Sequence, residues 1–260
     1  MITLKEVLVL TALSFPLLSY AQEGKNRDKS DSLQIAIPTF SAKLLVVPGS
    51  LMLYGTIETL LAPKYRLLNY ALGHEVITHQ PPKFTIDDIT QYVPAASVYI
   101  LNLSGVKGMH NFKDRTIILG IASLFTAASV NALKYTTNVE RPDKSAFNSF
   151  PSGHTAVAFM GAEFLWQEYK DVSPWIGVGG YIVATATGGL RLYNNKHWVG
   201  DIAFGAGVGI LSTKLAYWLY PAIQNKLSNR RNKRNNVFDD FVCSPYYNGR
   251  QGGLSVLKQF

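Results

Sequence analysis

The sequence predicts an all-α protein, an integral-membrane bundle of five to six transmembrane helices. Three observations predict this fold: apolar stretches recur along the chain, glycine and alanine are dense in the last of them, and charged residues are scarce. Of the 260 residues, 47% are hydrophobic but only 16% are charged, whereas about 25% of an average globular domain is charged. This composition argues against a disordered chain, and the lone cysteine, Cys243, excludes a disulfide scaffold.

Six apolar stretches follow a polar leader. Several are shorter than the roughly 17–25 residues of a full membrane span, which explains the low mean hydropathy of +0.07. The last two contain the runs GVGGYIVATATGG and GDIAFGAGVG, whose small residues suit close helix packing in lipid. A soluble helical enzyme is the alternative, since short apolar runs also occur in soluble cores. The stretches are Leu44–Ala62, Tyr92–Val106, Ile117–Leu133, Thr155–Trp166, Trp175–Leu190 and Val199–Tyr220.

The first residues are typical of a secretory signal peptide. Lys5 lies in a short polar region, residues 7–18 are apolar, and Ala21 ends a small-residue cleavage pattern. We expect cleavage after Ala21, with an uncleaved anchor helix as the alternative. In either case the chain enters or crosses a membrane.

The net charge of +8 is concentrated behind the last apolar stretch. A nucleic-acid-binding arm is one interpretation of this cluster. A cytoplasmic flank that orients the helices fits better, because the cluster follows the interfacial aromatic residues Trp218 and Tyr220. We therefore expect the bilayer, and no nucleic acid, as a partner. The five positive residues are Lys226, Arg230, Arg231, Lys233 and Arg234.

Charge also predicts the topology and the division of the chain. A second basic group, Lys107, Lys113 and Arg115, favours the cytoplasm, so that loops 134–154 and 191–198 face outward. A cleaved signal peptide leaves the mature N-terminus outside, so Leu44–Ala62 would lie in the interface or re-enter. The predicted segments are a signal peptide (1–21), a polar segment with apolar or interfacial helices (22–91), a helical core (92–220) and a basic C-terminal tail (221–260).

Three polar segments lie beside the apolar stretches, where charged groups are expensive and usually functional. In the first, Lys134 and Arg141 are seven residues apart, so both would lie on one helix face before Pro142 ends the helix. Two cations at a helix end suit a phosphate group. A solvated basic face is the simpler interpretation of this segment taken alone.

The second polar segment is Pro151-Ser152-Gly153-His154, ahead of an apolar run. It predicts a tight turn into a helix N-terminus, where free backbone N–H groups bind anions. His154 would then lie where it can pass a proton to an oxygen of that anion. Serine and glycine also cap ordinary helices, which is the structural alternative.

The third polar segment contains Arg191, His197 and Asp201. The last two are four residues apart at the start of a helix, so their side chains should meet. A carboxylate on one imidazole nitrogen fixes the tautomer and makes the other nitrogen nucleophilic. Arg191 would add a bidentate contact to phosphate. Alone, this segment would be an ordinary surface His–Asp pair.

Taken in order, the spacings Lys-x6-Arg-Pro, Pro-Ser-Gly-His and Arg-x5-His-x3-Asp resemble the signature of the type-2 phosphatidic acid phosphatase superfamily. That superfamily also includes bacterial acid phosphatases, glucose-6-phosphatase and vanadium haloperoxidases. The resemblance covers about residues 92–220 and has one departure, because Leu190 stands where a serine usually precedes the arginine.

The resemblance implies a role for each residue. His197 would attack phosphorus and form a phosphohistidine, Asp201 would orient it, and His154 would protonate the leaving alcohol and then activate water. No metal and no cofactor is implied, and His74, His79 and His110 show no ligand pattern. The phosphoryl oxygens would be held by Lys134, Arg141, Ser152, Gly153 and Arg191.

These roles predict a phosphatase that acts on a membrane lipid at the periplasmic surface of a bacterial inner membrane. The candidate substrates are a lipid A phosphate, which we favour, undecaprenyl diphosphate and phosphatidylglycerol phosphate. The segment Asp87–Arg115 is similar to envelope phosphatases of Gram-negative bacteria. A soluble periplasmic acid phosphatase, a vanadium-dependent haloperoxidase and a non-catalytic membrane adaptor are the alternatives, and the oligomeric state is open.

Overall fold

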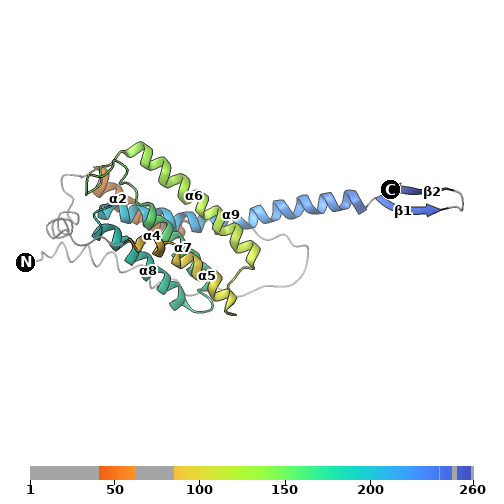
Figure 1. The fold of residues 1–260 in the computed structure, drawn as a ribbon, viewed down its shortest axis with the longest axis horizontal. Coiled ribbons are helices and arrows are strands. Elements are labelled where there is room, and N and C mark those ends of the chain that lie inside the picture. Colours follow the sequence, from red (N-terminus) through yellow and green to blue (C-terminus); the bar gives the residue numbers. More distant parts are fainter. Residues whose placement is uncertain (1–40, 62–84, 240, 248–250, 259–260) are drawn as a thin grey trace, which may run out of the picture.

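The computed structural model describes residues 41–61, 85–239, 241–247 and 251–258. The signal peptide, His74 and His79 lie outside the described residues, as do the side chains of the basic cluster beyond Lys226. The described core is helical, as the sequence predicts (Figure 1). Its helices are α2 (Val46–Thr56), α4 (Asp87–Thr90), α5 (Val93–Leu103), α6 (Phe112–Thr137), α7 (Gly153–Tyr169), α8 (Pro174–Tyr193) and α9 (Val199–Asp239).

The helices run alternately toward and away from one end of the bundle. Helices α6 and α8 end there with Lys134 and Arg191, whereas α7 and α9 begin there with His154 and Asp201. A short 3₁₀ helix (Ala42–Leu45) precedes α2, and a π-helical turn (Ile57–Leu61) follows it. Because consecutive helices are antiparallel, residues far apart in the sequence meet at this end.

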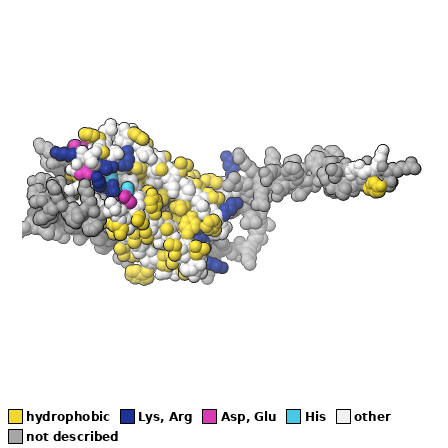
Figure 2. All heavy atoms as spheres, viewed as in Figure 1, with side chains coloured by type: hydrophobic (Ala, Val, Ile, Leu, Met, Phe, Trp, Pro, Cys, Tyr) yellow, Lys and Arg dark blue, Asp and Glu magenta, His cyan; other side chains and the backbone are white. Residues whose placement is uncertain are grey.

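Two of the described helices are long and apolar enough to cross a bilayer. They are α6, with 26 residues, and the first 28 residues of α9, Val199–Lys226. At 1.5 Å per residue each exceeds the roughly 30 Å of a hydrocarbon core. Apolar side chains cover the flank of the bundle. Acidic, basic and histidine side chains gather at one end, and further Lys and Arg side chains lie at the other end (Figure 2). The number of spanning helices, five to six, stays a prediction.

Glycines on α9 allow it to pack tightly against α7. A Cβ atom added at Gly205 would lie 2.5 Å from the carbonyl oxygen of Ser152, and one at Gly209 would lie 2.2 Å from that of Ala156. A Cβ atom at Gly200 would lie 2.2 Å from Oγ1 of Thr59, on the segment that follows α2. Side chains at these positions would push the helices apart, so the glycines hold the start of α9 close to its neighbours.

We expect Gly209→Ala to destabilise the bundle, because its methyl group would press on backbone that cannot rotate away. Overpacking of this kind costs about 1–3 kcal/mol. The matched control is Gly179→Ala on α8, where an added Cβ meets nothing within 4 Å and the better helix propensity of alanine should be neutral or stabilising. Thermal unfolding of both variants in detergent measures the difference. Equal melting temperatures would contradict the tight packing.

At the other end of the bundle, α9 continues past Tyr220 to Asp239 and leads into a two-stranded antiparallel hairpin (Figure 1). The strands are β1 (Phe241–Tyr247) and β2 (Gly252–Lys258), with Cys243 paired to Val256 in the register. Helix α9 therefore separates the hairpin from the end of the bundle where the polar segments meet.

Candidate active site

The structure brings the three polar segments together at one end of the bundle. The backbone N–H of Ser152 donates to the carbonyl oxygen of Asp201 at 3.0 Å, which joins the second and third segments. A Cβ atom at Gly153 would lie 4.0 Å from Cε of Lys134, so the first segment lies beside the second. The site therefore forms where four helix ends meet.

The expectation that Lys134 and Arg141 share a helix face is wrong. Helix α6 ends at Thr137, and Asn138 follows in the left-handed conformation with φ +47°. Such a residue ends many helices, so the helix ends five residues before Pro142. Arg141 instead lies in the loop that follows, near enough for its guanidinium to repel the Lys134 ammonium group. The two cations still lie near each other, because the loop brings Arg141 back toward Lys134.

The turn before α7 is a helix N-cap, as its sequence predicts. Helix α7 begins at Gly153, and the Ser152 side chain accepts a hydrogen bond from the backbone N–H of Thr155. The Ser152 hydroxyl also lies 2.9 Å from the Thr155 hydroxyl and is fully buried. The serine thus orders the turn, and the first backbone N–H groups of α7 include donors that have no acceptor within the helix.

His197 lies just before α9 and faces Asp201 in its first turn. Its Nδ1 atom is 3.6 Å from Oδ2 of Asp201, and both side chains are almost completely buried. Burial lowers the pKa of His197 to about 4, an effect that the neighbouring Asp201 carboxylate opposes and the charges of Arg191 and Lys134 reinforce. The imidazole is therefore neutral at neutral pH. Because Nδ1 faces the carboxylate, Nε2 is the nitrogen left for a ligand.

Asp201 is held by three donors from different parts of the chain. Its Oδ2 accepts hydrogen bonds from the Ser149 hydroxyl and, at 2.9 Å, from the backbone N–H of Trp198. The Thr59 hydroxyl donates to Oδ1 at 3.3 Å. Sequence reasoning did not single out Ser149 or Thr59, since a serine in a loop and a threonine in an apolar stretch carry no signal alone.

His154 is the second residue of α7, and its Nε2 atom lies 2.8 Å from Oδ1 of Asp88 on α4. Burial lowers the pKa of His154 below its ordinary value of 6.5, and the Arg191 charge adds to this. The carboxylates of Asp88 and Asp87 partly oppose the shift. The His154 side chain is also more exposed than that of His197, at 28% against 2%.

Arg191, in the last turn of α8, forms a buried ion pair with Asp87 of α4. Its NH1 atom lies 2.6 Å from Oδ2 of Asp87, and Asn194 donates to the other carboxylate oxygen at 3.4 Å. Among the described residues, the buried Nε atoms of Arg191 and Arg141 have no hydrogen-bond partner. Each guanidinium thus keeps a donor that an anion could use.

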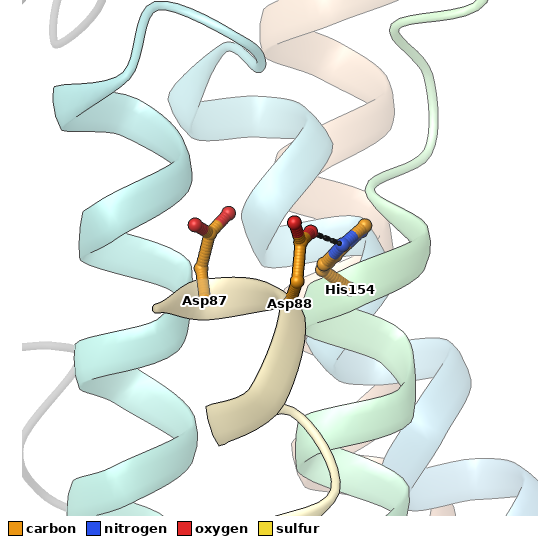
Figure 3. A group of neighbouring side chains, drawn as sticks. All are labelled: Asp87, Asp88 and His154. Carbon is orange, nitrogen blue, oxygen red and sulfur yellow. Dashed lines mark hydrogen bonds and ion pairs between the residues drawn. The ribbon is translucent and has the colours of Figure 1, made fainter. Parts of the chain in front are cut away.

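One group of side chains has the composition of a metal site. Ligand atoms of Asp87, Asp88 and His154 lie within 4.8 Å of one another (Figure 3). Each of these side chains already has a protein partner, because Asp87 pairs with Arg191 and Asp88 with His154. The contacts described above therefore account for the cluster, and metal independence stays a prediction.

The fold and the site together define a helical bundle that gathers three cationic side chains and two histidines at one end. Residues 115–225 match the model of the PAP2 superfamily. Over 137 residues it is 42% identical to the lipid A 1-phosphatase of Porphyromonas gingivalis, a match that covers 52% of this chain and 30% of that protein.

Other relatives are more distant. Over 107 residues the chain is 28% identical to the bacitracin transport permease protein BcrC of Bacillus licheniformis, covering 36% of this chain and 51% of that protein. The chain thus spans less than a third of one curated relative and about half of the other.

Two solved structures are similar. LpxE of Aquifex aeolicus has a TM-score of 0.40 at 24% identity, over 51% of this chain and 83% of that chain. The transmembrane PAP2 type phosphatidylglycerolphosphate phosphatase of Bacillus subtilis has a TM-score of 0.44 at 22% identity, over 66% of this chain and 94% of that chain.

Proposed function

We propose that this protein is a membrane lipid phosphatase that works through a phosphohistidine intermediate. The observation that carries the proposal is the buried pair of His197 and Asp201, with Nδ1 facing the carboxylate at 3.6 Å. A neutral imidazole whose other nitrogen is free is a nucleophile at neutral pH. The cations around it, Lys134, Arg141 and Arg191, match the charge that a phosphoryl group carries.

The first chemical step forms a bond between Nε2 of His197 and phosphorus and breaks the bond from phosphorus to the leaving oxygen. His154 gives its proton to that oxygen, so the lipid departs as an alcohol. Positive charge that develops on His197 is stabilised by Asp201. The three cations and the backbone N–H groups at the start of α7 hold the three phosphoryl oxygens as these move into the equatorial plane around phosphorus.

In the second step His154 acts as the base and His197 is the leaving group. His154, now neutral, accepts a proton from a water molecule as the water oxygen attacks phosphorus. The bond from phosphorus to Nε2 breaks, inorganic phosphate leaves, and His197 and His154 return to their starting protonation states. No step needs a metal ion, so the activity should persist in EDTA.

A lipid is the substrate class that the surroundings of the site favour. The site lies where α6 ends and α9 begins, and these are the two described helices that are long and apolar enough to span a bilayer. A lipid headgroup at the surface would therefore be within reach. We favour a lipid A phosphate, because the lipid A 1-phosphatase of P. gingivalis is 42% identical over the matched region. Undecaprenyl diphosphate and phosphatidylglycerol phosphate are the other candidates.

We further propose that the protein resides in a bacterial inner membrane with this site facing the periplasm. The basic residues at the other end of the bundle support this orientation, since Lys107 and Lys113 flank the start of α6 and Lys226 lies far along α9. Positive residues concentrate on the cytoplasmic side of membrane helices. The hairpin at the end of α9 would then lie in the cytoplasm.

The test is phosphate release by detergent-solubilised protein from lipid A, undecaprenyl diphosphate and phosphatidylglycerol phosphate, with and without EDTA. We expect release from at least one lipid, unaffected by the chelator. Hydrolysis of water-soluble esters alone, with extraction from membranes by alkaline wash, would instead support a soluble acid phosphatase. Vanadate-dependent bromide oxidation without phosphate release would support a haloperoxidase. Release that EDTA stops would refute the metal-free mechanism.

A further inference from the structure

Helix α4 is a short element that contacts two of the three polar segments. It is fastened to α8 by the ion pair between Asp87 and Arg191 at 2.6 Å and by the hydrogen bond between the hydroxyls of Thr187 and Thr90 at 2.9 Å. Asp87 is buried and cannot leave this position without exposing or unpairing the Arg191 charge. The backbone of α4 is therefore set by α8.

The next residue, Asp88, contacts α7 and not α8. Its Oδ1 atom lies 2.8 Å from Nε2 of His154 at the start of α7 (Figure 3). The Asp88 side chain is 60% exposed, whereas that of His154 is 28% exposed. Adjacent aspartates on α4 therefore contact two different segments: Asp87 pairs with Arg191, and Asp88 contacts His154.

We propose that Asp88 is a positioning residue for His154, and that Asp87, through Arg191, fixes the place from which Asp88 acts. This inference rests on the proposed function, in which His154 supplies and then accepts a proton. A carboxylate on the imidazole orients the ring and stabilises its protonated form. Helix α4 would thereby couple the general acid to a guanidinium that holds the phosphoryl group.

The charges that face His154 explain why it needs such a partner. Arg191 of α8 disfavours a proton on His154, and burial acts in the same direction. Asp87 and Asp88 of α4 oppose both effects. The other charged or titratable groups described above at this end of the bundle are Lys134 of α6, Arg141 of the following loop, His197 and Asp201. Because Asp87 is already paired with Arg191, Asp88 is the carboxylate that directly stabilises the imidazolium.

The experiment compares Asp88→Asn with wild type by NMR titration of ¹³Cε1-labelled histidines in detergent, the His154 signal being assigned by its loss in His154→Asn. Asparagine keeps the size of the side chain and removes its charge. We expect the pKa of His154 to fall by about half a pH unit to one unit, since the exposed carboxylate is partly screened. The matched control, Asp171→Asn on the exposed connection between α7 and α8, should leave this pKa unchanged.

Kinetics supply the second measurement. Because the first step needs protonated His154, the alkaline limb of kcat/KM should move to lower pH in Asp88→Asn by the same amount as the pKa. Asp88→Glu, which keeps the charge, should return the pKa of His154 most of the way to its wild-type value. The melting temperatures of both Asp88 variants should equal that of the wild type. An unchanged His154 pKa in Asp88→Asn would overturn the proposal. So would a wild-type His154 signal that shifts on addition of Mg²⁺, because the cluster would then be a cation site.

The two proposals fail in distinguishable ways. A wild-type protein that releases phosphate from no lipid refutes the lipid phosphatase, whereas the NMR titration still reports whether Asp88 sets the protonation of His154. Conversely, full lipid phosphatase activity with no change in the titration of Asp88→Asn leaves the enzyme established and removes the role of Asp88.

Discussion

His197→Ala is expected to lower phosphate release by about 10³-fold or more, because the variant lacks the only atom that would bond to phosphorus. The fold should survive, since His197 precedes α9 and its Nδ1 makes no hydrogen bond among the described residues. Phosphate release from the preferred lipid, together with the melting temperature, measures both effects. A suitable control is His110→Gln, which lies far from the site and can still donate to its partner Glu168.

The intermediate itself provides a sharper measurement. Brief reaction with radiolabelled lipid phosphate, quenched in base, should leave label on the wild-type protein that is released by acid, as expected of a phosphohistidine. His197→Ala should carry no label. Full activity in His197→Ala, or label that remains on that variant, would show that another group attacks phosphorus.

The second large effect is expected for His154→Ala, and its size should depend on the leaving group. For a lipid substrate we expect a loss of about 10²–10⁴-fold, the range typical of general acid–base catalysis. For p-nitrophenyl phosphate, whose leaving group departs without a proton, the loss in the first step should be much smaller. The burst of p-nitrophenol in rapid-mixing experiments isolates that step from the attack of water.

The same leaving-group series separates His154 from the residues that bind phosphate. Arg191→Lys, which keeps the charge but not the planar guanidinium, should slow both substrates to a similar degree. If His154→Ala also slowed both equally, its role would be binding or positioning of the phosphoryl group, and the proposed proton transfer would be wrong.

Local sequence patterns predicted those features that depend on neighbouring residues alone. Ser152 and Gly153 predicted the start of α7, because an N-cap serine and a following apolar run suffice to define it. The small residues of the last apolar stretch predicted close packing, and Gly205 and Gly209 do lie against α7. The prediction that Lys134 and Arg141 lie on one helix face was wrong, because Asn138 ends the helix before the proline does.

The contacts of Asp87 and Asp88 could not be predicted in this way. Two aspartates before an apolar stretch have the same appearance as any polar connection between helices. Their partners, Arg191 and His154, lie 104 and 66 residues further along the chain. Only the packing of α4 against α8 and α7 brings these charges together, and periodicity within a segment carries no information about it.

The amino-acid sequence by itself determined the helical character of the core, the polar segments that hold the candidate site residues, and the start of α7. These properties follow from hydrophobicity, capping and spacing, which act over a few residues. The tertiary structure decided how deeply those side chains are buried and which charged groups lie beside them. Burial of His197 beside Asp201 and the approach of Asp88 to His154 depend on helices distant in sequence, because desolvation and Coulomb interactions act through space.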